Sequence, residues 1–253
     1  MINHLLLFSL LSLSLSLQDL TTGKNLIWSD EFESTTLDQS KWTFEIGNND
    51  GWGNNELEYY TDRSENCYLT GGYLHIRAKR EDYNGFKYTS ARIKTQGKFY
   101  FQYGYIESRM SIPLSMGIWP AFWMLGENIN EVSWPKCGEI DIMEAVNREA
   151  KVYGTNHWDE NGHAQYGNVS PQFDVTQFHV YGMEWTDKVI RMFVDGEKYH
   201  EIDIENSKGG TDEFHKPFFF LFNVAVGGNW PGFDIEENAL PQELVVDYVR
   251  VYQ

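Results

Sequence analysis

Short runs in which apolar and polar residues alternate recur along this 253-residue chain, and no stretch keeps a helical period. Successive side chains of a β-strand point to opposite faces, so alternation predicts strands with one buried face. Residues 74–79, 90–94 and 244–252 alternate clearly, whereas residues 218–226 (FFFLFNVAV) are apolar throughout, as in a sandwich-core strand. Many strands joined by Gly, Asn and Asp turns predict an all-β fold, a β-sandwich jelly roll. Its curved sheet would form a groove for an extended polymer.

The length is that of one large domain. Residues 5–17 read LLLFSLLSLSLSL, an apolar run of signal-peptide length that is too short to span a bilayer. We therefore expect residues 1–17 to be a signal peptide and residues 18–253 to form the mature domain. No second apolar span follows. The sequence predicts a secreted or periplasmic protein, monomeric and free of the membrane once the signal is cleaved.

A net charge of −17 makes nucleic acid and other polyanions, including sulfated polysaccharides, unfavourable partners. Neutral polymers remain open. The 9 Trp, 15 Tyr and 16 Phe are numerous enough to supply sugar-stacking faces in addition to a core. The two cysteines, Cys67 and Cys137, could pair in an oxidising compartment, but two buried free thiols are favoured.

Residues 138–144 read GEIDIME and place three carboxylates within six residues. In a regular strand, Glu139 and Asp141 share one face and the isoleucines occupy the other. Glu144 has the wrong parity to join them. It does so only if an extra residue is absorbed near Met143 as a β-bulge, a device that re-aims side chains beside active sites. We therefore expect a bulge here and three carboxylates on one face.

A solvated acidic face is the ordinary alternative for such a strand. Three like charges on one short face repel each other, however, and a mixed-charge pattern would be better solvated. Motifs for other chemistries, such as H-E-x-x-H, C-x-x-C, a P-loop or G-x-S-x-G, are missing from the sequence. Retaining glycosidases use two carboxyls about 5–5.5 Å apart, one as nucleophile and one as acid/base. The motif predicts this chemistry.

Several further motifs occur in a characteristic order from about residue 26 to the end of the chain. They are WSDEF at 28–32, NNELEYYT at 54–61, SARI at 90–93, GIWPAFWML at 117–125, FH through EWT at 178–186, VGGNWPG at 226–232 and VDYVRV at 246–251. Together with GEIDIME, they resemble glycoside hydrolase family 16, and within it the laminarinase (endo-1,3-β-glucanase) type. The resemblance implies a concanavalin-like jelly roll, with residues 18–253 as a catalytic domain that needs no cofactor for catalysis.

The resemblance also implies a role for individual residues. Glu139 matches the nucleophile, Asp141 the assisting carboxylate and Glu144 the acid/base. The substrate-binding positions matched are Asn55, Arg92, Trp119, Trp123, His157 and Trp230. The ordinary alternatives are a core position for a Trp, a solvated face for Arg92 and a structural role for His157. The implied partner is a β-1,3-glucan, cut from within the chain with retention of configuration. Mixed-linkage glucan or a galactan such as agarose are alternative substrates, and a non-catalytic glucan-binding module is a third possibility.

A structural calcium is also implied by the resemblance. Its matching ligands are the backbone carbonyls of Glu31 and Gly72 with the side chain of Asp247. Asp247 shares the parity of Val249 and other valines of its run, which predicts an apolar face where a carboxylate needs a partner. An Arg or Lys pair is the ordinary alternative to calcium.

Overall fold

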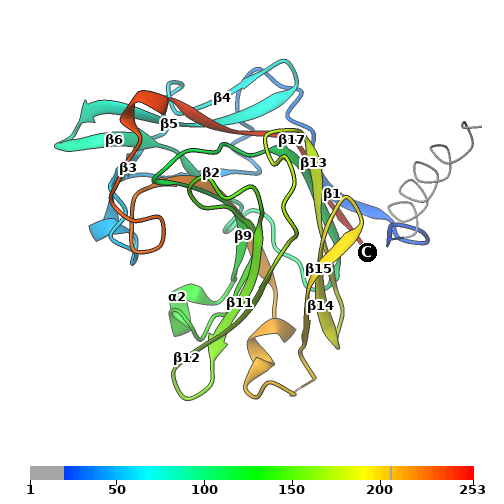
Figure 1. Ribbon diagram of the computed structural model, residues 1–253. Helices are drawn as coiled ribbons and strands as arrows, with labels where there is room; N and C mark the ends of the chain where they lie inside the picture. Colours follow the sequence, from blue (N-terminus) through cyan, green and yellow to red (C-terminus); the bar gives the residue numbers. More distant parts are fainter. Residues whose placement is uncertain (1–19, 206) are drawn as a thin grey trace, which may run out of the picture.

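The computed structural model describes residues 20–205 and 207–253, and two large sheets packed face to face form the framework of that part of the chain (Figure 1). The expected signal peptide lies outside the described residues. The larger sheet contains β1 (Leu26–Asp30), β3 (Glu58–Tyr60), β4 (Cys67–Thr70), β5 (Tyr73–Tyr83), β6 (Phe86–Ser90), β8 (Gly104–Ser111), β13 (His179–Trp185), β14 (Val189–Val194), β15 (Glu197–Asp203) and β17 (Gln242–Tyr252).

The smaller sheet contains β2 (Thr43–Glu45), β7 (Arg92–Lys94), β9 (Ile118–Gly126), β10 (Glu139–Glu144), β11 (Tyr153–Asp159), β12 (His163–Val169) and β16 (Phe218–Val226), in the order β12-β11-β10-β9-β16-β7-β2. Helical structure among the described residues is limited to α2 (Ile129–Val132) and 3₁₀ turns at Asn49–Gly51, Thr211–His215 and Glu237–Ala239. None of these helices is long and apolar enough to cross a membrane. The expected all-β jelly-roll sandwich is confirmed.

Strand β16 shows why a central strand can be apolar throughout. Phe218, Phe220 and Phe222 are buried in the main core between the sheets. The intervening Phe219 and Leu221 point the other way, into a small apolar cluster that also holds Leu125 and Cys137. These alternate residues underlie the concave side of the smaller sheet, so both faces of β16 are covered. Cys67 belongs to the main core instead, and both cysteines are buried free thiols.

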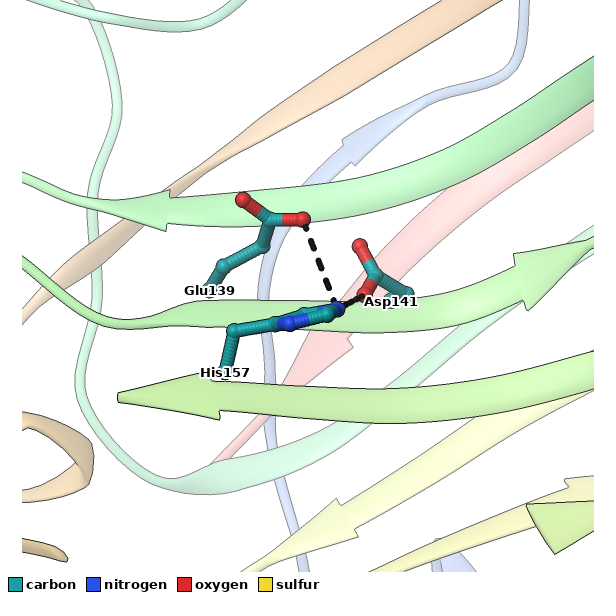
Figure 2. A group of neighbouring side chains, drawn as sticks. All are labelled: Glu139, Asp141 and His157. Carbon is teal, nitrogen blue, oxygen red and sulfur yellow. Dashed lines mark ion pairs between the residues drawn. The ribbon is translucent and has the colours of Figure 1, made fainter. Parts of the chain in front are cut away.

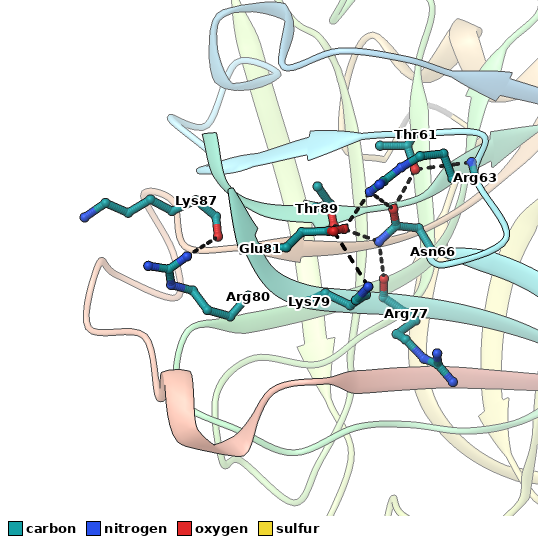
Figure 3. A network of polar contacts seen from close by, with 9 residues as sticks. All are labelled: Thr61, Arg63, Asn66, Arg77, Lys79, Arg80, Glu81, Lys87 and Thr89. Atoms are coloured by element: carbon teal, nitrogen blue, oxygen red, sulfur yellow. Dashed lines mark hydrogen bonds and ion pairs between the residues drawn. The ribbon is translucent and has the colours of Figure 1, made fainter. Parts of the chain in front are cut away.

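A polar network fixes the segment that follows β3 (Figure 3). At its centre the buried Asn66 accepts a hydrogen bond from Thr61 Oγ1 (2.6 Å) and from Arg63 Nη2 (3.1 Å). Its amide nitrogen donates to the Arg77 carbonyl and to Thr89 Oγ1, both at 3.0 Å. The Asn66 side chain thereby connects the segment after β3 to the neighbouring strands β5 and β6.

The expected position of Asp247 on an apolar face is wrong. The pairing of β17 with β8 shifts register between Val246 and Tyr248, which is a β-bulge. Because of that shift, Val246 and Val249 are both buried while Asp247 is half-buried, with 30% of its side chain exposed. The simple parity argument assumed an unbroken strand.

Candidate active site

The bulge expected in the acidic strand is present. Strand β10 lies between β9 and β11, and its pairing with β11 runs from Asp141 opposite Thr155 to Glu144 opposite Tyr153. Two residues, Ile142 and Met143, therefore oppose one, Gly154. Both are fully buried in the main core. The bulge keeps apolar side chains on the core side and brings Glu144 to the same face as the other two carboxylates.

Tyr199 of β15, in the opposite sheet, and Gly154 of β11 support the bulge. The Tyr199 hydroxyl of β15 donates a hydrogen bond to the carbonyl of Ile142. A Cβ atom at Gly154 would lie 2.8 Å from the Tyr199 ring and 2.5 Å from Met192 Sδ, so only glycine fits there. These contacts connect the shape of β10 to the opposite sheet. Sequence reasoning did not single out either residue, because their partners are far away along the chain.

Glu139, Asp141 and Glu144 all line a cleft of about 1080 Å³ on the concave side of the smaller sheet. Its floor includes Phe219, Leu221 and Asn223 of β16, and its walls carry Trp52, Trp119, Trp123, Trp134 and Trp230. Aromatic walls and an acidic floor are the combination that a neutral sugar polymer requires. The cleft is the groove that the strand pattern predicted.

His157 of β11 lies beside the two carboxylates nearest the start of β10 (Figure 2). Its Nε2 is 3.2 Å from Asp141 Oδ2 and 3.9 Å from Glu139 Oε1. Its other ring nitrogen, Nδ1, is 2.8 Å from Nε2 of His163, and Trp134 packs on the His163 ring with centroids 4.6 Å apart. The imidazole of His157 is thus oriented by a second histidine.

The same three residues form a compact group of potential ligand atoms. One oxygen or nitrogen each of Glu139, Asp141 and His157 lies within 4.8 Å of the others, close enough to hold a cation or to share protons. Proton sharing is the chemistry that a glycosidase needs from such a group.

Burial governs the protonation of this site. Desolvation, followed by the charge of Asp141, raises the pKa of Glu144 well above its usual range. The same two causes raise the pKa of Glu139 to about 8, while His157 acts in the opposite direction. Burial also raises the pKa of Asp141. The three adjacent carboxyls cannot all be ionised here, so some of them carry a proton at neutral pH.

Two tryptophans of β9 contribute differently to the cleft. Trp119 Nε1 donates a hydrogen bond to Glu144 Oε1 (2.9 Å), and its ring meets the Trp230 ring edge-on, with centroids 5.3 Å apart. Trp123 Nε1 instead donates to Asn223 Oδ1 (2.8 Å). Both side chains are half-buried and line the cleft, so the core alternative does not apply to either.

Arg92 forms part of the opposite wall. Its guanidinium lies between the rings of Trp52 (4.5 Å) and Trp123 (4.7 Å) and forms an ion pair with Glu45 of β2. Only 9% of Arg92 is exposed, which rules out a solvated face. The sequence did not point to Trp52 or Glu45 as site residues, although Trp52 lies two residues before the NNELEYYT motif.

Asn55 is the predicted site residue that the structure does not bring into the cleft. Its side chain is exposed, and its amide donates a hydrogen bond to Asn229 Oδ1 (2.8 Å). The neighbouring Asn54 lines the cleft instead. In the structure, Asn55 connects the loop after the 3₁₀ turn to the loop that carries Trp230.

Asp247, the one side-chain ligand of the predicted calcium, is paired with an arginine. The carboxylate of Asp247 forms an ion pair with Arg109, which is the ordinary alternative that the sequence left open. The Glu31 carboxylate is likewise occupied, because Arg250 donates to both of its oxygens, at 3.0 and 2.7 Å. A guanidinium beside the one anionic ligand opposes a second cation, so the side chains as arranged fit an arginine pair better than Ca²⁺.

A β-sandwich with a concave aromatic cleft and three partly protonated carboxylates on its floor defines a polysaccharide-cleaving class of protein. The comparison with family models agrees: residues 38–250 match Glycosyl hydrolases family 16, and the chain belongs to this family.

The relatives of the chain include enzymes and a clotting-factor subunit. It is 48% identical over 232 residues to the clotting factor G alpha subunit of Tachypleus tridentatus, covering 90% of this chain but only 34% of that relative. It is 42% identical to a beta-glucanase of Rhodothermus marinus, covering 90% of this chain and 85% of that protein. Among solved structures, the catalytic domain of an endo-1,3-beta-glucanase (laminarinase) from Thermotoga petrophila is 43% identical with a TM-score of 0.80, covering 91% and 98% of the two chains.

Proposed function

We propose that this protein is an endo-acting hydrolase of β-1,3-glucan that retains the anomeric configuration. The observation that carries the proposal is the face shared by Glu139, Asp141 and Glu144 on the floor of an open cleft, made possible by the bulge at Ile142 and Met143. The family, and relatives described as beta-glucanase and laminarinase, support the same activity. An open cleft admits a polymer along its length, which favours internal cleavage over trimming of ends.

The two outer carboxylates have complementary roles in this proposal. Glu139 attacks the anomeric carbon and forms a glycosyl-enzyme, while Glu144 gives its proton to the leaving oxygen. Glu144 then takes a proton from water, whose oxygen attacks the same carbon and releases Glu139. The raised pKa of Glu144 suits the acid step, because the group is still protonated at neutral pH.

Asp141 and His157 influence the ionisation of the nucleophile, Glu139. Glu139 must be ionised to attack, yet burial and the charge of Asp141 raise its pKa. A proton on Asp141 would remove that repulsion. The imidazole of His157, which faces both groups, lowers the pKa of Glu139. Both effects favour the ionised form of Glu139 that attacks the sugar.

The binding residues divide between the two sides of the carboxylates. Arg92 and Trp123 form one wall, whereas Trp119 and Trp230 form an aromatic corner beside Glu144. We assign sugar contacts to these four side chains and to His157. Asn55 is assigned to positioning of the Trp230 loop through its bond to Asn229.

One experiment tests the substrate. The protein is incubated separately with laminarin, lichenan, agarose and carrageenan, and the products are sized over time. We expect laminarin to yield oligosaccharides of mixed length from the first minutes. Glucose as the sole early product would overturn internal cleavage. Faster cleavage of agarose than of laminarin would overturn the glucan assignment, and cleavage of none of the four would favour a binding module.

The structural calcium at Glu31, Gly72 and Asp247 stays a prediction. A Ca²⁺ ion there has to displace or share Asp247 with Arg109. The test compares the Tm of chelator-treated protein with and without excess CaCl₂. A rise of several degrees that Asp247→Asn abolishes would support the ion, and an unchanged Tm would leave Arg109 as the partner of Asp247.

We also propose secretion after removal of residues 1–17, and a monomeric mature protein. Both rest on the sequence pattern alone. N-terminal sequencing of the protein recovered from medium or periplasm tests the first, and light scattering coupled to size exclusion tests the second. Recovery of the intact N-terminus from the cell interior would overturn secretion.

A further inference from the structure

A chain of hydrogen bonds runs from the cleft wall into the interior. Trp123 Nε1 donates to Asn223 Oδ1 (2.8 Å), and Asn223 Nδ2 donates to the Tyr60 hydroxyl (3.1 Å). The Tyr60 hydroxyl donates in turn to Glu56 Oε2 (3.1 Å). Tyr60 is fully buried and Asn223 is 5% exposed. The orientation of the Trp123 ring therefore depends on groups behind the cleft, on strands distant in sequence.

The chain ends in a buried pair of carboxyls that the catalytic mechanism does not use. Glu58 is fully buried, and its Oε2 accepts the backbone N–H of Val226 (2.6 Å). Its other oxygen, Oε1, has no donor among the described residues. Burial, followed by the charge of Glu56, raises the pKa of Glu58.

At its cleft-wall end, the chain of hydrogen bonds reaches a cation, the guanidinium of Arg92. Trp123 covers one face of the Arg92 guanidinium and Trp52 the other, at 4.7 and 4.5 Å. A cation between two rings is stabilised only while both rings keep their place. Release of the Trp123 indole from Asn223 would therefore loosen Arg92 as well. Both side chains belong to the wall assigned to sugar binding.

We propose that Tyr60 is a positioning residue for substrate binding, which holds Trp123 and Arg92 in the cleft wall through its hydrogen bonds to Asn223 and Glu56. The inference rests on the proposed function, because the ligand of this wall is the glucan chain. Tyr60 is fully buried, so it does not contact the sugar. Loss of its hydroxyl should weaken binding along the wall while the reacting carboxylates on β10 stay intact.

A pair of Tyr→Phe variants separates this role from general packing. Tyr60→Phe removes the hydroxyl that links Asn223 to Glu56. Tyr88→Phe removes a hydroxyl that donates to Glu237 (2.7 Å), a residue that does not line the cleft. On laminarin, Tyr60→Phe should raise KM roughly three- to tenfold with kcat changed by less than about twofold, as expected for one lost hydrogen bond. Tyr88→Phe should leave both constants unchanged. An unchanged KM in Tyr60→Phe would overturn the proposal.

A second readout needs no substrate. The indole N–H of Trp123, assigned in the NMR spectrum by its loss in Trp123→Phe, should exchange with solvent about tenfold faster or more in Tyr60→Phe than in the wild type. Equal exchange rates would overturn the positioning chain. If exchange accelerates while the wild type cleaves no β-glucan, the chain stands as a device that positions Trp123 and the proposed function fails.

Discussion

The indole Nε1–H of Trp119 donates a hydrogen bond to Oε1 of Glu144 across 2.9 Å, from one strand of the concave sheet to the next. Because the bond reaches the group proposed as acid/base, it should fix the direction of the carboxyl that protonates the leaving oxygen. The bond also favours the charged form and lowers the pKa of Glu144, against the larger effect of burial.

Replacement of that tryptophan is the first prediction. Trp119→Phe keeps an aromatic ring beside Trp230 but removes the donor. We expect kcat on laminarin to fall about tenfold, and the alkaline limb of the kcat profile to move to higher pH because Glu144 loses a bond to its charged form. Trp230→Phe, which removes no bond to a carboxyl, should leave the alkaline limb where it is. A Trp119→Phe enzyme with wild-type kcat would show that the bond is structural only.

The nucleophile gives the second prediction. Glu139→Ser should abolish hydrolysis of laminarin and leave binding of laminari-oligosaccharides within a few-fold of the wild type, because the aromatic walls are untouched. The measurement pairs product analysis with calorimetric titration. Near-normal activity in Glu139→Ser would mean that another group attacks, and the double-displacement role assigned to Glu139 would have to be withdrawn.

The third prediction concerns pH. The charge of Asp141 contributes to the raised pKa of both Glu139 and Glu144. Asp141→Asn removes that charge but can still donate a hydrogen bond, so both pKa values should fall. Since Glu139 must be ionised and Glu144 protonated, the acid and alkaline limbs of kcat/KM should both move to lower pH. We expect Asp141→Asn to keep partial activity, with a loss of kcat/KM of about 10²–10⁴-fold, the range typical of acid–base assistance. A profile that moves to higher pH would contradict the coupling.

The bulge gives the fourth prediction. Deletion of Met143 would leave one residue opposite Gly154, so that simple alternation keeps Glu144 on the cleft face without a bulge, while the chain after the strand shifts by one residue. Because Ile142 and Met143 are both buried in the core, the deletion should lower Tm more than Glu144→Ala, which empties only a cleft position. Thermal unfolding of the two variants makes the comparison. A smaller loss of Tm for the deletion would mean that the bulge is dispensable for folding.

Stereochemistry is the companion measurement for that strand. With the nucleophile and the acid/base on one face, the first products of laminarin should be β-anomers, detected by proton NMR before mutarotation. An initial α-anomer signal would mean inversion, in which case water rather than Glu139 attacks the sugar.

The fifth prediction concerns stability in acid. Burial lowers the pKa of His200 to about 4, and its ring contacts Asn156 Oδ1 (2.7 Å) and Asn168 Oδ1 (3.0 Å) on β11 and β12, the two strands that carry His157 and His163. The unfolded chain binds this proton at a higher pH than the folded one, so stability is lost as pH falls from about 6.5 to about 4. The loss should reach roughly 3 kcal/mol at the acid end. His200→Gln should be less stable overall but show a flatter decline of Tm across that window.

Local sequence was sufficient for the elements and for the catalytic strand. Alternation predicted the sandwich, and the parity of Glu144 predicted the bulge, because strand faces and their interruption are properties of consecutive residues. The same parity argument failed at Asp247, because it assumed an unbroken strand and a second bulge interrupts the alternation there. Trp119 and Trp123 were placed in the cleft correctly, but their different partners, Glu144 and Asn223, were not foreseen.

Tertiary structure alone decided the contacts between distant strands. Arg92 meets Glu45 and two tryptophans only because β2, β7 and β9 are assembled around β16, and Tyr60 reaches Asn223 across 163 positions of the chain. The packing of the strands also placed the Asn55 amide against Asn229 and paired Asp247 with Arg109. The sequence determined which chemical groups are available and on which strand face most of them lie. Their partners and their pKa values depend on burial and on the register between strands, which arise only when the two sheets pack.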